Sequence, residues 1–341
     1  MCKRGYFQQP GRAVVPGTPR SVPAVEEELP ANRLALARWI TDRGNPLTAR
    51  VAVNRWWAEF FGRGLVATEE DFGTQGEPPT HAEVLDWLAV EFMEAGWSRK
   101  AIHRAMVLSA VYRQDSRLTE EKLEADPDNH LLARGPRFRL AAEAVRDNAL
   151  AAAGLLSAKM GGPPVFPPQP AGVWRHVGRN EPKYETSTGE DRYRRGVYVF
   201  WRRSAPYPAF TNFDAPDRAS CTAARARTNT PLQALTLLND PAYLEMARAL
   251  ALRMAADLPE ATLAERIEYG FQRCLARKPN EVERAHLVQV FERERERYAA
   301  DAKAARALAG DIPAGLAAED LAAWCCVANI LLNLDEMITK G

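Results

Sequence analysis

A group of carboxylates, arginines and one cysteine lies between residues 214 and 227 of this 341-residue chain. Asp214 and Asp217 flank Pro216, and a turn at this proline would bring the two carboxylates close together. Paired carboxylates are the groups that general acid–base catalysis requires, and they also bind hard cations. Asp214 and Asp217 are therefore candidate catalytic residues.

Arginines surround these carboxylates, and guanidinium groups bind anions through paired hydrogen bonds. Thr230-Pro231 is typical of the start of a helix, and helix N-termini bind anions. The two residues just before it are therefore also candidates for anion binding. The candidate anion-binding residues are Arg194, Arg203, Arg218, Arg225, Arg227, Thr228 and Asn229. The same residues have a structural interpretation, in which aspartate caps a turn and arginines complete a network of ion pairs.

Cys221 is the third candidate catalytic residue, since a thiolate is a nucleophile when a base lies beside it. No histidine is near it in the sequence, so His176 would have to approach through the fold. Without such a base, the tendency of cysteine to be buried favours an inert, buried thiol.

Arginines also alternate with aromatic residues over 194–203, in a strand-like run centred on 197–201. This composition is typical of surfaces that stack single-stranded nucleic acid. However, 45 basic and 44 acidic residues nearly cancel, so no overall field attracts nucleic acid or an anionic membrane. We expect cation–π packing or salt bridges here instead, and no nucleic-acid partner.

Cysteine and histidine spacing gives no sign of a cofactor. The five cysteines form no C-x-x-C pair, no haem attachment motif and no zinc pattern, and no two histidines lie four residues apart. Cys325 and Cys326 lie in an apolar helical run, where buried thiols are expected. We expect no metal site and no haem in this chain.

No stretch of the sequence has the length of a membrane span. The longest apolar run, 321–332, is too short, and the basic, proline- and glycine-rich residues 1–31 lack the apolar core of a signal peptide. We expect no membrane span, and the sequence assigns no location.

Apolar residues at helical spacing and helix-capping residues predict a mainly α fold with helical hairpins and a small β element near 194–203. Capping boxes are expected at Thr80/Glu83, Thr262/Glu265 and Asn280/Glu283. The expected helices cover about 32–40, 46–61, 81–95, 98–112, 140–159, 231–238, 241–258, 281–308 and 321–338. The charged stretch 292–297 should be solvated.

Changes in composition divide the chain into four parts. Residues 1–31 are expected to form a linker or extended arm, and 32–160 an N-terminal helical subdomain. Residues 161–230 form an irregular central segment with short strands, and 231–341 a C-terminal helical subdomain.

Several motifs, in order, resemble the planctomycete family that contains the domain of unknown function 1553. They cover residues 32–39 (NRLALARW), 45–56 (NPLTARVAVNRW), 61–66 (FGRGLV), 71–73 (DFG), 76–81 (GEPPTH), 109–114 (SAVYRQ), 213–218 (FDAPDR) with Cys221, 228–235 (TNTPLQAL), 237–240 (LLND) and 331–336 (LLNLDE). Such domains form the C-terminal part of larger proteins that often carry cytochrome c-like segments upstream. Relatives are typically exported to the periplasm or cell surface.

The resemblance implies an accessory or binding domain of an exported multidomain protein, here without the upstream domains. Its partner would be a cytochrome c-like or other upstream domain, with redox partnership as a weaker idea, or an extracellular polymer. The alternative is a hydrolase of an anionic polysaccharide or ester, in which Asp214 and Asp217 act with the arginine cluster.

Overall fold

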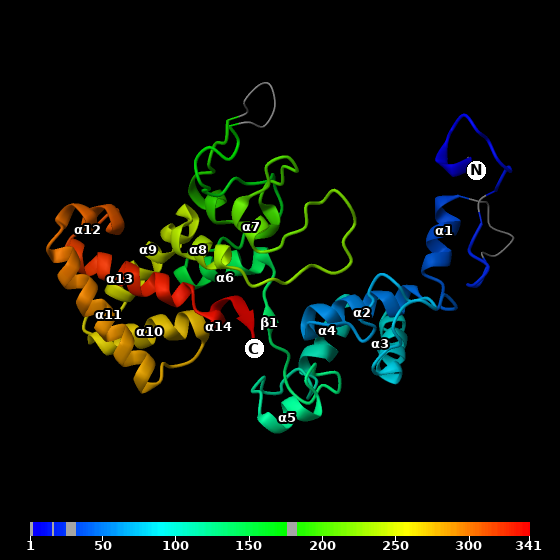
Figure 1. Cartoon of the computed structure of the whole chain (residues 1–341), viewed down its shortest axis with the longest axis horizontal. Helices are drawn as coiled ribbons and strands as arrows, with labels where there is room; N and C mark the ends of the chain where they lie inside the picture. Colours follow the sequence, from blue (N-terminus) through cyan, green and yellow to red (C-terminus); the bar gives the residue numbers. More distant parts are fainter. Residues whose placement is uncertain (1–2, 16, 25–31, 176–182) are drawn as a thin grey trace. The chain divides into compact units, whose positions relative to one another are not determined.

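Helices dominate the computed structural model, which describes residues 3–15, 17–24, 32–175 and 183–341 (Figure 1). The chain forms two compact units, 1–136 and 137–341, which are described separately. Among the described residues, regular strands are limited to β1 (Phe138–Arg139) and β2 (Thr339–Lys340). The mainly α fold expected from the sequence is confirmed. None of the helices described is both long and apolar enough to cross a membrane.

The first unit packs three helices around one core. Its elements are η1 (Lys3–Gly5), α1 (Arg33–Ile40), α2 (Thr48–Phe61), α3 (Ala82–Glu94), α4 (Arg99–Leu108) and α5 (Glu120–Ala125). Asn45 precedes α2, where its side-chain oxygen accepts the backbone N–H groups of Leu47 at 3.0 Å and Thr48 at 3.3 Å. Gly62 ends this helix at a φ of 82°. Helices α2, α3 and α4 bury Val53, Trp57, Leu85, Leu88, Ile102 and Met106.

The capping box expected at the start of α3 is absent, so that prediction was wrong. His81 is the N-cap residue of α3 and makes no side-chain capping bond. Thr80 instead donates its backbone N–H to the carbonyl of Leu65 at 2.8 Å. The boxes at Thr262/Glu265 and Asn280/Glu283, in the second unit, are both confirmed.

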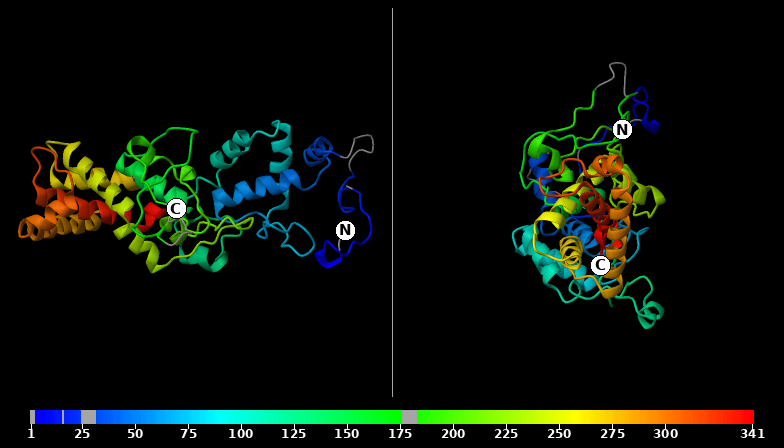
Figure 2. Two further views of the ribbon diagram at one scale, coloured as in Figure 1. Left: turned by 90° about the horizontal axis from the view of Figure 1, so that it is seen from above. Right: turned by 90° about the vertical axis from the view of Figure 1, so that its left-hand side faces the viewer.

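The second unit contains the larger core, with α13 (Ala318–Leu332) at its centre. Helix α13 packs against α9 (Pro241–Ala256), α11 (Glu281–Ala299) and α12 (Ala302–Ala309). Figure 2 shows these helices, yellow to red, lying side by side. The remaining elements are α6 (Ala142–Ala153), η2 (Gly189–Tyr193), η3 (Gly196–Tyr198), α7 (Pro208–Asn212), α8 (Pro231–Asn239), α10 (Leu263–Leu275) and α14 (Asp335–Ile338).

Two expected helices of the second unit differ from the structure. Helix α6 ends at Ala153 rather than near 159, because Gly154 adopts a left-handed φ of 71°. The helix expected over 281–308 divides into α11 and α12. Asp301 begins the second of these, since its carboxylate accepts the N–H of Ala304 at 2.9 Å.

The β element expected near 194–203 is not a strand, so this part of the fold prediction is corrected. The backbone turns through η3, where the N–H of Tyr198 donates to the carbonyl of Arg195 at 3.0 Å. Only isolated bridges form at Arg194 and Val199. In a tight turn, backbone N–H and C=O groups bond to one another, whereas in a strand they would bond to a neighbouring strand. The two-stranded sheet instead joins β1 to β2, in antiparallel register.

The two units do not follow the sequence-based divisions at 160 and 230. Helix α6 belongs to the second unit, because Val145 and Leu150 enter the same core as Leu250 of α9. The central segment 161–230 contributes Val165 and Phe210 to that core. The described residues of the expected arm, 3–15 and 17–24, are largely exposed.

Candidate functional site

Asp214 lies two residues after the end of α7 and closes a loop. The carboxylate of Asp214 accepts hydrogen bonds from the backbone N–H of Thr228 at 2.8 Å and from the hydroxyl of Thr228 at 2.9 Å. The same carboxylate pairs with Arg139 of β1. Arg139 also donates to the carbonyls of Thr228 at 3.0 Å and Phe213 at 3.3 Å. The side chains of Arg139 and Asp214 are only 9% and 17% exposed. We call this group the loop clamp (Arg139, Asp214, Thr228), because it joins the two ends of the segment 215–227.

Asp217 has separate partners. Its carboxylate accepts the N–H of Ala219 at 2.9 Å, which is a local turn, and the side chain of Asp217 is exposed. Arg218 lies over the ring of Trp201, 4.5 Å from the centroid. No hydrogen bond or ion pair joins Asp217 to Asp214 within the described residues.

The arginines proposed for anion binding are dispersed. Arg194 is fully buried, donates to the carbonyls of Pro163 at 3.1 Å and Gly161, and lies 3.8 Å from the centroid of the Tyr198 ring. Its guanidinium therefore ties the segment 161–163 to the turn at η3. Arg203 is exposed.

Arg225 and Arg227 are also engaged within the chain. Arg225 donates to both oxygens of Glu143 on α6, at 2.7 and 3.3 Å, and Arg227 lies over the ring of Phe138 at 4.4 Å. Burial alone would raise the pKa of Glu143, but hydrogen bonds from Arg225 and the backbone outweigh it and lower that pKa. Both arginines fasten the loop rather than converge on one site.

Cys221 is exposed, which corrects the expectation of a buried thiol. It lies within the segment that the loop clamp closes, away from the apolar core. His176, the only base considered for it, lies outside the described residues. Of the two helix-start candidates, Thr228 gives its N–H and hydroxyl to Asp214, and Asn229 is exposed.

Two arginines that hold the central segment, one partly and one fully buried, were not among the residues predicted from the sequence. Arg139 of the loop clamp is one. Arg146 of α6 is the other, and it donates to the carbonyls of Arg194 at 2.7 Å and Arg192 at 3.1 Å. Their carbonyl and carboxylate partners lie about fifty to ninety residues further along the chain, so no local spacing pointed to either residue.

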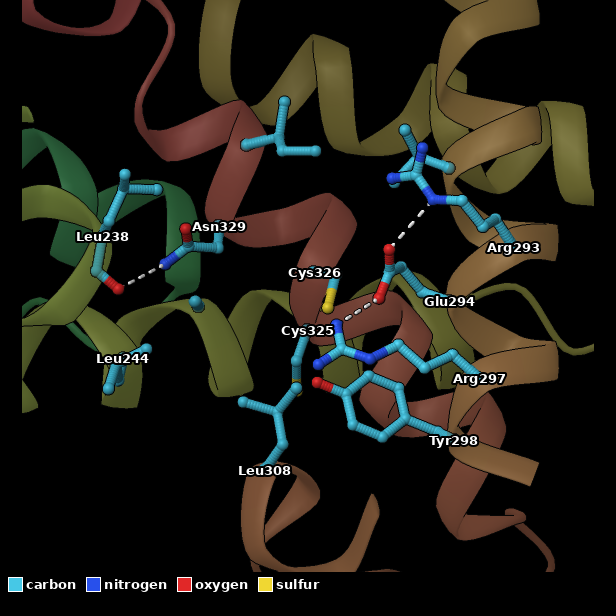
Figure 3. A pocket seen from close by; sticks show the side chains of 13 residues that line it. Leu238, Leu244, Arg293, Glu294, Arg297, Tyr298, Leu308, Cys325, Cys326 and Asn329 are labelled. Atoms are coloured by element: carbon cyan, nitrogen blue, oxygen red, sulfur yellow. Dashed lines mark hydrogen bonds and ion pairs between the residues drawn. The ribbon is translucent and has the colours of Figure 1, made fainter. Parts of the chain in front are cut away.

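A pocket of about 340 Å³ lies in the second unit, where five helices meet (Figure 3). No motif in the sequence pointed to this pocket. Its walls are mainly apolar, with a set of charged and polar groups along α11. It is lined by Leu238, Leu244, Ala247, Val290, Arg293, Glu294, Arg297, Tyr298, Leu308, Cys325, Cys326, Asn329 and Ile330.

Glu294 holds two arginines at this pocket. Its two oxygens accept Arg293 Nε at 3.1 Å and Arg297 Nη1 at 3.0 Å, as the dashed lines in Figure 3 show. Glu294 is buried, so the prediction that residues 292–297 are solvated was wrong at this position. Because the neighbours of Glu294 are all charged, no local pattern indicated that this residue faces inward.

The two thiols of this pocket are not activated. Burial raises the pKa of Cys325 to about 12 and also raises the pKa of Cys326. Both are therefore largely protonated at neutral pH, and neither is an activated nucleophile.

Helix α8 carries an unusual distribution of side chains. It buries two polar residues, Gln233 and Thr236, beside Leu237, and exposes its three other leucines. We call the exposed row, Leu232, Leu235 and Leu238, the leucine face; its side chains are 60%, 51% and 37% exposed. Leu238 also lines the pocket, so the two surfaces are continuous.

A second pocket, of about 250 Å³, lies in the first unit between α2, α3 and α4 and is lined by Trp57, His81 and Trp87 among others. In the part of the chain that the structure describes, no group of three or more histidine, cysteine, aspartate or glutamate side chains is placed to hold a metal ion.

Comparison with known proteins gives a family and no closer relative. No curated protein and no solved structure matches the chain. A family model described as PSD1, protein of unknown function (DUF1553), matches residues 32–291. This match covers most of the first unit and the second unit as far as α11, and on it the chain belongs to the DUF1553 family of proteins of unknown function.

Proposed function

We propose that this chain is a binding domain, and that it docks a partner protein through the leucine face of α8. The observation that carries the proposal is the orientation of α8, which exposes Leu232, Leu235 and Leu238, while its buried side is made of Gln233, Thr236 and Leu237. Residues spaced three apart lie on one side of a helix, so Leu232, Leu235 and Leu238 form one continuous row.

Hydrogen bonds hold α8 in this orientation. Asn212 of α7 donates to the hydroxyl of Thr236 at 2.8 Å, and Gln233 donates to the hydroxyl of Thr228 at 3.2 Å. The hydroxyl of Thr236 also donates to the carbonyl of Leu232 at 2.7 Å. Turning the leucines inward would break the bonds from Asn212 to Thr236 and from Gln233 to Thr228, so the row stays on the surface.

A row of exposed leucines favours association. Covering one fully exposed leucine contributes roughly 1.5–3 kcal/mol, and this gain is not realised while the leucine face contacts water. Single exposed leucines are ordinary, whereas contiguous apolar surface marks interaction sites. The occupant that we propose is a folded protein domain with a complementary apolar patch. The upstream domain expected from the family resemblance, cytochrome c-like or other, is the first candidate.

The test places a photo-cross-linking amino acid at Leu235 in the native host, with Val282 as the control position. Val282 is also an exposed apolar residue, at the start of α11 and outside the leucine face. We expect a discrete adduct with one protein from position 235 and none of that adduct from 282.

The captured protein is then purified and its Kd measured against variants of the full chain. Leu232→Gln with Leu235→Gln should weaken binding at least about tenfold, the loss of roughly 1.4 kcal/mol, whereas Val282→Gln should change it less than about twofold. Equal effects of the two substitutions, or the same adducts at both positions, would contradict the proposal.

A further inference from the structure

The pocket between α8, α9, α11, α12 and α13 has two chemically different parts. Leu244, Val290, Leu308 and Ile330 come from four different helices and make an apolar interior. The guanidinium groups of Arg293 and Arg297 stand along α11, on one side of this interior (Figure 3). Their side chains are 70% and 69% exposed, so both reach water as well as the pocket.

The charge of this pocket is positive. Arg293 and Arg297 share a single carboxylate, Glu294, so the three groups together carry one positive charge. Each guanidinium has five N–H donors, and Glu294 receives one from each arginine. Donors therefore remain on both arginines for a ligand, while each oxygen of Glu294 already accepts a hydrogen bond.

We propose that this pocket binds a small amphipathic carboxylate, with its hydrocarbon chain in the apolar interior and its carboxylate on Arg293 and Arg297. The volume of about 340 Å³ is in the range of small-molecule sites, which are mostly apolar with a few polar groups that fix orientation. A carboxylate suits this arrangement because guanidinium groups bind it through two parallel hydrogen bonds. A cationic head group would be repelled by the two arginines. A neutral head group would not form charge-assisted hydrogen bonds with them.

Glu294 positions the arginines rather than contacting the ligand. With its two oxygens it fixes Arg293 and Arg297, which lie one helical turn apart, on the same side of α11. The pair is thus oriented before a ligand arrives, which lowers the entropic cost of binding. This site is separate in chemistry from the docking of a partner at the leucine face, although Leu238 borders both.

The thiol of Cys326 provides a reporter inside the pocket, because it lines the pocket and is only partly buried. The experiment uses the full chain with Cys2→Ser and Cys221→Ser, which removes the thiol at residue 2 and the exposed one at 221. N-ethylmaleimide reacts with the small thiolate fraction of Cys326, so the modification is slow, and its rate is followed by mass spectrometry over a long incubation at pH 7.5. The added probes are decanoate, decanol and decylamine, each below its micelle concentration.

We expect decanoate to slow the modification of Cys326 several-fold and in a saturable way, whereas decanol and decylamine have little effect. Arg297→Gln should weaken the apparent affinity for decanoate about tenfold, the effect of losing a charge-assisted hydrogen bond. Arg295→Gln is the matched control, since Arg295 lies on the same helix but pairs with Asp320 outside the pocket lining.

Three results would overturn the proposal: no protection by decanoate, equal protection by decanol, or equal loss in the Arg295 and Arg297 variants. None of them depends on the leucine face. Leu235→Gln should leave protection by decanoate unchanged while weakening the proposed partner, so the two proposals fail separately.

Discussion

The loop clamp and the α11 pocket use the same residue types for different purposes. In the clamp, a carboxylate and a guanidinium are both largely covered, and the donors of Arg139 go to Asp214 and to carbonyls of the chain. In the pocket, the carboxylate of Glu294 is covered but the two guanidinium groups are mostly exposed. The two groups have the same residue types, so composition does not decide their role. An arginine is structural when its N–H donors bond to other groups of the chain, and it is available for binding when donors remain accessible to solvent.

The clamp gives the largest expected effect. Asp214→Asn keeps an acceptor and tolerates the left-handed backbone at this position, where φ is 60°. It removes the charge opposite Arg139, so we expect a loss of about 3 kcal/mol in the free energy of unfolding. Urea denaturation measures it. A loss below about 1 kcal/mol would mean that the clamp is not the structural pair described above.

Asp240 differs from the carboxylates of both regions, because it is a buried carboxyl whose hydrogen bond comes from the backbone N–H of Ala242. Burial raises the pKa of Asp240 to about 6 in the folded chain, above its unfolded value. The folded state thus holds the proton more tightly, and the associated stability is present below about pH 4 and lost as pH rises through 6.

The expected size of this effect is about 2 kcal/mol. Urea denaturation of Asp240→Asn across pH 4 to 7 should show that this part of the pH dependence has disappeared, since asparagine still caps α9. An unchanged pH profile would assign the dependence to another group.

Glu294→Gln tests the pocket side of the comparison. Arg293 and Arg297 reach water, so losing their shared charge leaves neither of them buried and unpaired. We expect a loss of only about 1 kcal/mol in the free energy of unfolding. Thermal and urea unfolding measure it beside Asp214→Asn. A loss as large as that of the clamp variant would remove the distinction between the two regions.

Asp217→Asn has the smallest expected effect on stability, within about 0.5 kcal/mol, because the side chain is exposed and makes a local turn. The variant also tests the hydrolase alternative. If the chain turns over an anionic polysaccharide or ester, and this substitution abolishes turnover while the fold is unchanged, Asp217 is catalytic and the loop is more than a structural segment.

Local signals in the sequence predicted the helices well. Gly62, Asn280 and Thr262 act at their own helix ends, and their roles follow from neighbours within four residues. The sequence also located the loop of charged residues. It did not show that Arg139 and Glu143, each about eighty residues away, take up the charges of that loop.

One wrong prediction, at Glu294, and one feature for which no prediction was made, the leucines of α8, both occur where tertiary packing reverses a local pattern. Glu294 lies among charged neighbours and is buried, whereas the leucines of α8 are exposed beside a buried glutamine. Periodicity identifies the two faces of a helix but does not say which face meets the core. In both cases the exception adjoins the surfaces that we propose for binding, which is where conflict between local and global preference is expected.

The pairing of β1 with β2 has a consequence for biogenesis. It joins the first residues of the second unit to its last, through Phe138 opposite Lys340 and Arg139 opposite Thr339. During synthesis on the ribosome, β1 and the central helices emerge before α13 and β2, so this unit cannot complete its fold until α13 and β2 have emerged. Until then Arg139, which later anchors the loop, is held by no strand. The second unit should therefore complete its fold only after β2 has been synthesised.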